Sequence, residues 1–272
     1  MNAEDFQDIC AHVYDKAGIV LGEDKQYLID SRLKPIMKEF DYGNLSELVS
    51  QLKINSAGKL SQSVVDAVTT NETSFLRDST PFDALRNDIL ARLIHARQDE
   101  RKLTIWSAAC SSGQEAYSIL MIIKEYFPEL SDWQIKFICT DISSEMVERC
   151  KTGVYSSLEV NRGLPANLMV RYFNQVDGNW VVKDDLRRQL EVKQLNLHQS
   201  WGTIPHCDII FMRNVLIYFD LDAKREALER ASRQLNPDGV LFLGASETTL
   251  GICDAFEVRT SGKGRYYMPR SD

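Results

Sequence analysis

The chain has 272 residues, enough for one large domain or for a large and a small one, and its 44% hydrophobic and 26% charged residues are typical of a globular protein. Its net charge of −7 argues against a nucleic-acid partner, because proteins held by phosphate contacts are usually basic. Residues 1–5 are acidic, unlike a signal peptide, and apolar runs such as 119–123 are too short to span a bilayer, so we expect a cytoplasmic protein without direct membrane insertion.

The first 68 residues predict a small helical domain. Apolar residues recur at helical spacing in four segments, and no strand-like alternation interrupts them. The four stripes are Phe6, Ile9, Cys10 and Val13; Leu33, Ile36, Met37 and Phe40; Leu45, Leu48, Val49 and Leu52; and Val64, Val65 and Val68. Gly18 is a stop signal for the first helix, and Pro35 is a possible kink in the second.

From residue 103 onward, short apolar runs alternate with helical patterns, which predicts a parallel sheet covered on both faces. Strands are expected at 103–106, 135–139, 190–195, 208–212 and 240–243. A helix is expected at 222–235, stopped by Pro237 and Gly239. The last two runs, 256–259 and 265–268, predict a hairpin that adds antiparallel strands at one edge.

Two segments interrupt this alternation. Residues 153–190 are longer than a simple crossover requires and contain turn signals and a strand-like run at 180–182, so we expect an inserted small β-subdomain there. Residues 69–82 connect the helical domain to a sheet domain over 83–272. Short polar residues and Arg77 suit a linker folded over a site, where Arg77 could clamp a carboxylate of a cofactor or a substrate, although a solvated linker is the alternative.

Ligands of a doubly wound sheet bind at the carboxyl ends of its strands. The turn at 108–115 follows the first strand and has one glycine in place of GxGxxG, which disfavours a dinucleotide but allows S-adenosylmethionine (SAM), a cofactor without pyrophosphate. Glu115 could pair with the amino group of the cofactor, or only complement the helix dipole. Asp141 follows the second strand and could accept hydrogen bonds from both ribose hydroxyls, or cap the next helix.

Polar residues also follow the third and fourth strands. Asn196 and Leu197 could flank an adenine ring, or belong to an ordinary loop. Arg213 and Asn214 directly follow a buried strand and should lie beside the cofactor and the reactive centre. Tyr218 could place its hydroxyl near a substrate carboxylate, or pack beneath its loop. The six cysteines form no CxxC pair and the four histidines lack metal-ligand spacing, so no metal is expected.

Together these segments resemble the chemotaxis-receptor protein-glutamate methyltransferases, the CheR family. The likeness spans nearly the whole chain and rests on Asn-Glu-Thr-Ser-Phe-Leu-Arg at 71–77, Trp-Ser-Ala-Ala-Cys-Ser-Ser-Gly-Gln-Glu at 106–115, Thr-Asp-Ile-Ser at 140–143 and Arg-Asn-Val-Leu-Ile-Tyr-Phe at 213–219. It implies an α/β class I SAM-dependent methyltransferase fold, Rossmann-like with a seven-stranded mixed sheet, a small all-helical N-terminal domain and an inserted subdomain of three short strands. It also implies methylation of glutamate side chains on methyl-accepting chemotaxis receptors for sensory adaptation, with S-adenosylhomocysteine as the product.

The resemblance further implies roles for individual residues. The SAM pocket would be lined by Asn71, Thr73, Arg77, Glu115, Asp141, Asn196, Leu197, Arg213 and Asn214. Arg77 and Tyr218 would lie nearest the transferred methyl as catalytic residues. Lys25, Arg32, Lys34 and Lys38 would meet the acidic helical bundle of the receptor, although basic residues on a helix are also typical of a solvated face.

The chain departs from the family pattern at two places. The loop at 174–180 is short and holds one glycine, whereas relatives that grip the C-terminal peptide of the receptor tend to have a longer, more glycine-rich loop, so we expect this chain not to need that tether. The turn reads Gly-Gln-Glu-Ala at 113–116 where relatives often have Gly-Glu-Glu-Pro, but Glu115 is retained. Two other functions remain open, a SAM-dependent methyltransferase of another protein or small molecule and a catalytically silent SAM-binding docking module; the presence of Arg77 and Tyr218 disfavours the second.

Overall fold

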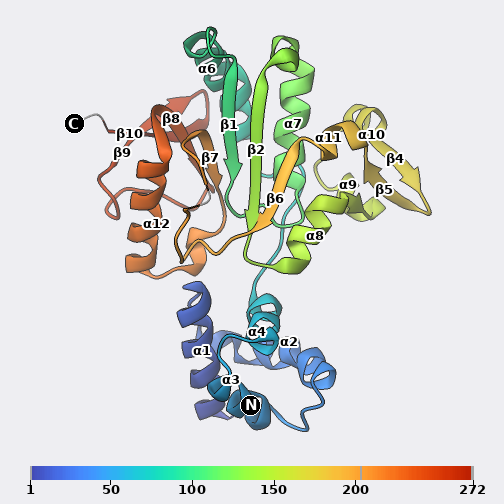
Figure 1. Ribbon diagram of the computed structural model, residues 1–272, viewed down its shortest axis with the longest axis vertical. Coiled ribbons are helices and arrows are strands. Elements are labelled where there is room, and N and C mark those ends of the chain that lie inside the picture. The colour runs from blue at the N-terminus through green and yellow to red at the C-terminus, as the bar shows by residue number, and fades with distance from the viewer. Residues whose placement is uncertain (1, 203, 271–272) are drawn as a thin grey trace.

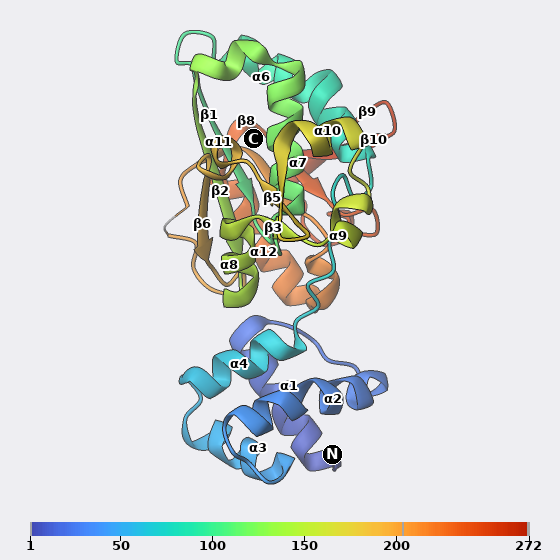
Figure 2. The same cartoon turned by 90° about the vertical axis from the view of Figure 1, so that its right-hand side faces the viewer.

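A computed structural model describes residues 2–202 and 204–270, and the outer bounds of the expected domains, residues 1 and 272, lie outside this description. A four-helix unit lies at one end of the molecule, and a larger unit built around a sheet lies at the other (Figure 1). A single extended segment after α4 leads from one unit to the other (Figure 2).

The N-terminal unit owes its helices to the predicted apolar stripes. Its elements are α1 (Ala3–Ala17), the 3-10 turn η1 (Glu23–Lys25), α2 (Gln26–Glu39), α3 (Leu45–Ile54) and α4 (Lys59–Val68). Members of all four stripes are completely buried, among them Ile9, Leu33, Leu48 and Val64. Helix α1 ends at Ala17 and is capped by Gly18, whose φ of 68° lies in the left-handed region that glycine adopts without strain, and α2 continues through Pro35 to Glu39.

The larger unit contains a seven-stranded sheet in the order β6-β2-β1-β7-β8-β10-β9. The strands are β1 (Lys102–Ser107), β2 (Gln134–Asp141), β6 (Leu190–Gln194), β7 (Cys207–Met212), β8 (Leu235–Leu243), β9 (Phe256–Ser261) and β10 (Gly264–Pro269). The five strands from β6 to β8 are parallel, whereas β10 is antiparallel to both β8 and β9. This arrangement confirms the mixed doubly wound sheet with a closing hairpin.

Side chains of successive residues in each central strand enter different cores. Ile105 packs in the core that contains α6 and α7, and its neighbour Trp106 packs in the core that contains α12 and the N-terminal helices. The elements around the sheet are α5 (Thr80–Ala84), the π-helical turn η2 (Leu85–Ile89), α6 (Leu90–Ala96), α7 (Gln114–Tyr126), η3 (Pro128–Asp132), α8 (Ser144–Thr152), η4 (Leu216–Tyr218) and α12 (Leu221–Gln234). The helical unit therefore shares a continuous apolar core with one face of the sheet.

The prediction that Pro237 and Gly239 lie between α12 and the next strand is wrong. The helix ends at Gln234, and β8 begins at the next residue, so Pro237 and Gly239 lie inside the strand. Cys207 pairs with Leu235 but Ile209 pairs with Val240, which leaves extra residues of β8 in an irregularity of the ladder. Proline is tolerated there because a bulged residue does not need to donate a ladder hydrogen bond.

The inserted subdomain beside α8 lies within the expected segment 153–190: its elements run from Val154 to Arg187, and Leu190 already belongs to β6. It contains β3 (Val154–Tyr155), α9 (Ser157–Asn161), α10 (Ala166–Tyr172), β4 (Phe173–Val176), β5 (Asn179–Val182) and α11 (Asp184–Arg187), and its strands form a separate sheet in the order β3-β5-β4. Asp177 and Gly178, with φ of 49° and 80°, form the two-residue turn between β4 and β5. Phe75 of the linker packs edge-on against Tyr155 and Phe173, with ring centroids 5.1 and 5.6 Å away, which anchors the linker to this subdomain.

Candidate active site

A cavity lies at the carboxyl ends of β1, β2, β6 and β7. Residues 69–74 and Arg77 of the linker form one wall, and Ala17 and Ile19 bring the helical unit to its rim. Ile19 also bridges to Phe219 in the segment after β7, so the two units are joined beside the cavity. A concave space at the switch point of a parallel sheet is where small-molecule ligands of such folds bind.

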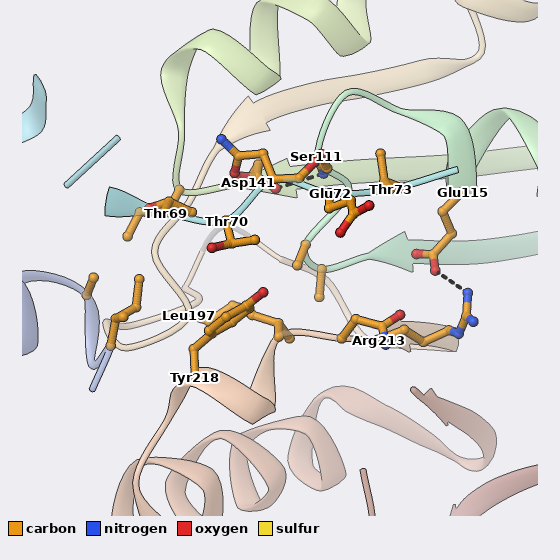
Figure 3. A pocket seen from close by; sticks show the side chains of 18 of the residues that line it. Thr69, Thr70, Glu72, Thr73, Ser111, Glu115, Asp141, Leu197, Arg213 and Tyr218 are labelled. Carbon is orange, nitrogen blue, oxygen red and sulfur yellow. Dashed lines mark hydrogen bonds and ion pairs between the residues drawn. The ribbon is translucent and has the colours of Figure 1, made fainter. Parts of the chain in front are cut away.

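The cavity gathers every residue that the sequence analysis assigned to the cofactor or to the chemistry. Its lining includes Asn71, Thr73, Arg77, Glu115, Asp141, Asn196, Leu197, Arg213, Asn214 and Tyr218. These residues come from the linker and from the ends of four strands, which only the folded sheet brings together. In Figure 3 the linker side chains face those of the segment after β7 across the cavity.

Asp141 joins the turn after β1 to the end of β2. Its carboxylate accepts hydrogen bonds from the backbone N–H groups of Ser111 at 2.7 Å and Ser143 at 3.0 Å (Figure 3 shows the bond to Ser111). Helix α8 is capped by Ser143, whose hydroxyl accepts from Met146, so Asp141 is not the cap that was considered as its alternative role. Burial raises the pKa of Asp141 to about 6, because the interior disfavours the charged form.

Glu115 and Arg213 form a buried ion pair across the cavity wall (Figure 3). Arg213 Nη1 donates to Glu115 Oε2 at 3.0 Å, and the hydroxyl of Ser107 donates to Glu115 Oε1 at 2.7 Å. Nη2 of Arg213 reaches the linker, where it donates to the carbonyl of Arg77 at 2.7 Å and to Asp78 at 3.2 Å. The Arg213 side chain is only 2% exposed, so this pair fixes the linker to the sheet as well as lining the cavity.

The linker reaches the cavity through an unusual backbone path. Leu76 and Asp78, with φ of 51° and 52°, both lie in the left-handed region that residues other than glycine rarely adopt. The Leu76 N–H donates to the hydroxyl of Ser118 at 3.0 Å, and Arg77 Nη1 donates to the carbonyl of Glu72 at 2.8 Å. The two left-handed residues on either side of Arg77 thus fold the linker back so that Arg77 lines the cavity.

Asn196 has a role that the sequence did not indicate. Its amide nitrogen donates to the carbonyl of Lys16 at the end of α1, and its oxygen accepts from the N–H of His198 at 2.9 Å. The side chain therefore binds the helical unit to the end of β6 at the rim of the cavity. Leu197, which is 5% exposed, supplies an apolar surface beside it.

Tyr218 lies on the opposite side of the cavity from the linker. Its ring projects from the segment after β7 toward Thr70 and Glu72 (Figure 3). The side chain is half-buried, and within the described part of the chain its hydroxyl has no hydrogen-bond partner. Tyr218 thus lines the cavity and also packs against the core beside it, so its role at the site stays a prediction.

The residues expected to meet a partner lie outside the cavity, on η1 and α2. Lys25, Lys34 and Lys38 are exposed, and Lys34 lies 3.7 Å from Asp30. Arg32 is half-buried, and its Nη1 donates to the carbonyls of Val68 at 2.9 Å and Thr69 at 3.2 Å. Arg32 therefore links α2 to the end of α4, where the linker begins.

Several residues of the site were missed from the sequence. Ala17 and Ile19 line the cavity, but helical periodicity does not tell which end of the helical unit meets the sheet. Ile142 lies within a motif that was noticed, yet only its neighbour Asp141 was singled out. Over residues 2–202 and 204–270, no three His, Cys, Asp or Glu side chains come together as metal ligands, and none of the helices is long and apolar enough to cross a membrane.

Comparisons with known proteins identify the family of the chain. The family model "CheR methyltransferase, all-alpha domain" matches residues 4–69, and "CheR methyltransferase, SAM binding domain" matches residues 71–264. Chemotaxis protein methyltransferase Cher2 of Pseudomonas putida and chemotaxis protein methyltransferase 1 of Pseudomonas aeruginosa are each 41% identical over 271 residues, which cover 98% of both chains. Chemotaxis protein methyltransferase 1 of Vibrio cholerae is 39% identical over 97% of this chain and 96% of its own. The chain is a SAM-dependent methyltransferase and belongs to the CheR family.

Proposed function

We propose that this enzyme transfers the methyl group of SAM to specific glutamate side chains of methyl-accepting chemotaxis receptors, and that the resulting methyl esters serve sensory adaptation. The observation that carries the proposal is that one cavity unites all the expected cofactor residues with Arg77 and Tyr218. The names of the relatives as chemotaxis protein methyltransferases support the choice of receptors as substrates. We place the reaction in the cytoplasm.

The cavity suits SAM by the chemistry of its lining. Asp141 offers a buried carboxylate for the two ribose hydroxyls, and Leu197 offers an apolar surface for the adenine ring. Glu115 would attract the amino group of the methionine part, and Arg77 or Arg213 its carboxylate. Asn71, Thr73, Asn196 and Asn214 complete the polar lining, with Asn196 acting through the contact between the two units.

Arg77 and Tyr218 are the residues that we assign to the substrate. When bound, SAM supplies a methyl group on a cationic sulfur, which an ionised carboxylate accepts without a general base. A glutamate with a pKa of about 4.3 is already ionised at neutral pH, so the enzyme must desolvate and orient it. Taking an anion out of water is unfavourable unless donors replace the water, and the guanidinium of Arg77 and the hydroxyl of Tyr218 are two donors in the cavity lining.

The receptor would meet the enzyme along α2. Lys25 on η1 and Lys34 and Lys38 on α2 are exposed cations that an acidic helical bundle would complement, while Arg32 would contribute mainly by holding α2 in place. Tyr27 and Leu28, which are 85% and 44% exposed, add an apolar surface on the same helix. Binding to receptor fragments should weaken as ionic strength rises; binding that is independent of salt would remove this assignment.

A C-terminal peptide tether on the receptor should not be needed. The turn between β4 and β5 consists of only Asp177 and Gly178, which leaves little loop to close over a peptide. Calorimetry with a receptor C-terminal peptide should therefore give no binding in the micromolar range. Detectable micromolar affinity would overturn this part of the proposal.

The function is tested by transfer of labelled methyl from SAM to cytoplasmic receptor fragments, scored as methanol released by base. Base-labile label that disappears when the target glutamates are replaced by alanine is the expected result, because esters hydrolyse in base whereas methylated amines do not. If SAM binds but several receptors accept no label, the substrate is another protein or a small molecule, or the chain is a docking module.

A further inference from the structure

A buried carboxylate outside the cavity lining binds the backbone of the segment that leads to Tyr218. Glu247 follows β8 and is 6% exposed. Its Oε2 accepts the N–H groups of Gly244 at 2.6 Å and Asn214 at 2.8 Å, and its Oε1 accepts those of Val215 at 2.9 Å and Leu216 at 2.8 Å. Four backbone donors on one carboxylate balance its charge and leave little freedom in the peptide units that they belong to.

These bonds set the direction in which the segment after β7 presents its side chains. Asn214 has a φ of 58°, in the left-handed region, and the turn η4 begins two residues later. With the N–H groups of 214–216 directed to Glu247, the chain turns so that Asn214, Val215 and Tyr218 line the cavity. Glu247 itself is absent from that lining, so it acts through these residues.

The fit around the carboxylate is tight. A Cβ at Gly244 would lie 2.7 Å from Glu247 Oε2 and 2.7 Å from Asn214 Nδ2, closer than real Cβ contacts allow. The bonds to Glu247 therefore require glycine at 244. A methyl group there would push the carboxylate and the Asn214 backbone apart without removing either.

We propose that Glu247 is a positioning residue for methyl transfer, which holds Asn214 and Tyr218 at the cavity by accepting the N–H groups of the segment between them. The inference rests on the proposed function for its kinetic part, since Tyr218 is assigned there to the substrate. A small displacement of such groups is enough to slow a reaction, because misplacement by about 1 Å can reduce a rate on the order of 100-fold.

A matched control exists at the other end of the sheet. Asp208 is also buried, and its carboxylate accepts from the N–H of Thr104, from the guanidinium of Arg97 and from the amide of Asn236. It lies near the start of β7, whereas Glu247 binds the residues that follow the end of β7. A purely structural role would make the two carboxylates equivalent in their effect on activity.

The test compares Glu247→Gln, Gly244→Ala and Asp208→Asn with the wild type. In the glutamine variant two of the four N–H groups face the side-chain NH₂ whichever way the amide turns. The melting temperature, the dissociation constant of SAM by calorimetry, and kcat and KM for a receptor fragment are measured at a temperature where every variant is folded. If Glu247→Gln does not fold, Gly244→Ala still strains the same bonds with the carboxylate in place.

We expect Glu247→Gln and Gly244→Ala to lower kcat at least about tenfold and to weaken SAM binding severalfold, with the receptor KM little changed. Asp208→Asn should lower the melting temperature at least as much but leave kcat and SAM affinity within about twofold. Folded Glu247→Gln or Gly244→Ala variants that match Asp208→Asn in both kcat and SAM affinity would overturn the inference. If the wild type does not methylate receptors, the proposed function fails, but the SAM affinities of these variants still decide the role of Glu247.

Discussion

The amino and carboxyl edges of the parallel sheet each bury a carboxylate with several donors, but the donors belong to different kinds of structure. Asp208 at the amino edge holds the side chains of Arg97 and Asn236 and the backbone of β1. Glu247 at the carboxyl edge holds the backbone of a loop whose side chains line the cavity. The same chemistry thus fastens elements to one another at one edge and shapes a binding surface at the other.

The arginines of the two edges differ in the same way. Arg97 binds Asp208 and Asp238. The pKa of Arg97 is raised, mainly by its hydrogen bond with Asp238, and the same guanidinium lowers the pKa of Asp238. Arg213 binds Glu115 and also holds the linker carbonyl of Arg77, and its Nε is buried without a partner among the residues that the structure describes. Ion pairs stabilise the fold at both edges. Only at the carboxyl edge does the ion pair also hold residues that line the cavity.

The largest effect is expected when Arg213 is replaced by methionine. This change leaves Glu115 buried without its ionic partner and frees the linker, which should reduce the free energy of unfolding by about 3–5 kcal/mol and abolish measurable SAM binding. Urea unfolding and calorimetry measure the two effects. Arg97→Met is the control for the comparison: it should also be destabilised, but it should bind SAM within about twofold of the wild type, and loss of SAM binding there would show that the two edges are not functionally distinct.

A smaller effect on stability, with a large effect on turnover, is expected for Arg77→Ala. Among residues 2–202 and 204–270 the Arg77 side chain makes a single hydrogen bond, to the Glu72 carbonyl, so stability should change by less than about 1 kcal/mol. Turnover should fall about 100-fold or more, because the substrate carboxylate loses a charged donor. Arg162→Ala is the matched control, since Arg162 binds the side chain of the same Glu72 at 2.9 Å but does not line the cavity. Equal turnover in the two variants would remove Arg77 from the catalytic assignment.

The elements that could be predicted from sequence are those whose pattern reflects local burial. The stripes of α1 to α4 and the apolar runs of β1, β2 and β7 repeat with the period of the structure that buries them, as the complete burial of Ile9, Leu33 and Ile105 shows. The segment 80–96 was not assigned, although it forms α5, η2 and α6. The strand β8 begins at Leu235, five residues before the predicted start at residue 240, because a proline within an irregular ladder has the same local signature as a loop.

The residues of the site could be named from motifs, but not their partners. Glu115 and Arg213 are separated by 98 positions, and the contact of Asn196 with Lys16 spans 180. No periodicity records such pairs, because they depend on how the strands are ordered and on how the helical unit docks. Glu247 was missed for the same reason: its four donors come from two separate loops that only the sheet brings together.

The smallest expected effect is a change of SAM affinity with pH, which should depend on Asp141 but not on the structural carboxylate Asp208. Burial holds the pKa of Asp141 at about 6, so in the free enzyme this group gains a proton as the pH falls below 6. If its ionised form accepts the ribose hydroxyls, the dissociation constant of SAM should rise by up to about tenfold per pH unit below that point. The free energy of unfolding should change in the opposite sense. The stabilisation that comes from the raised pKa of Asp141 is fully present below the unfolded pKa of 3.8 and is lost as the pH rises through 6. Calorimetry between pH 5 and 7 should show the change in affinity for the wild type and for Asp208→Asn but not for Asp141→Asn, and a wild-type affinity that is constant over this range would exclude Asp141 as the ribose ligand.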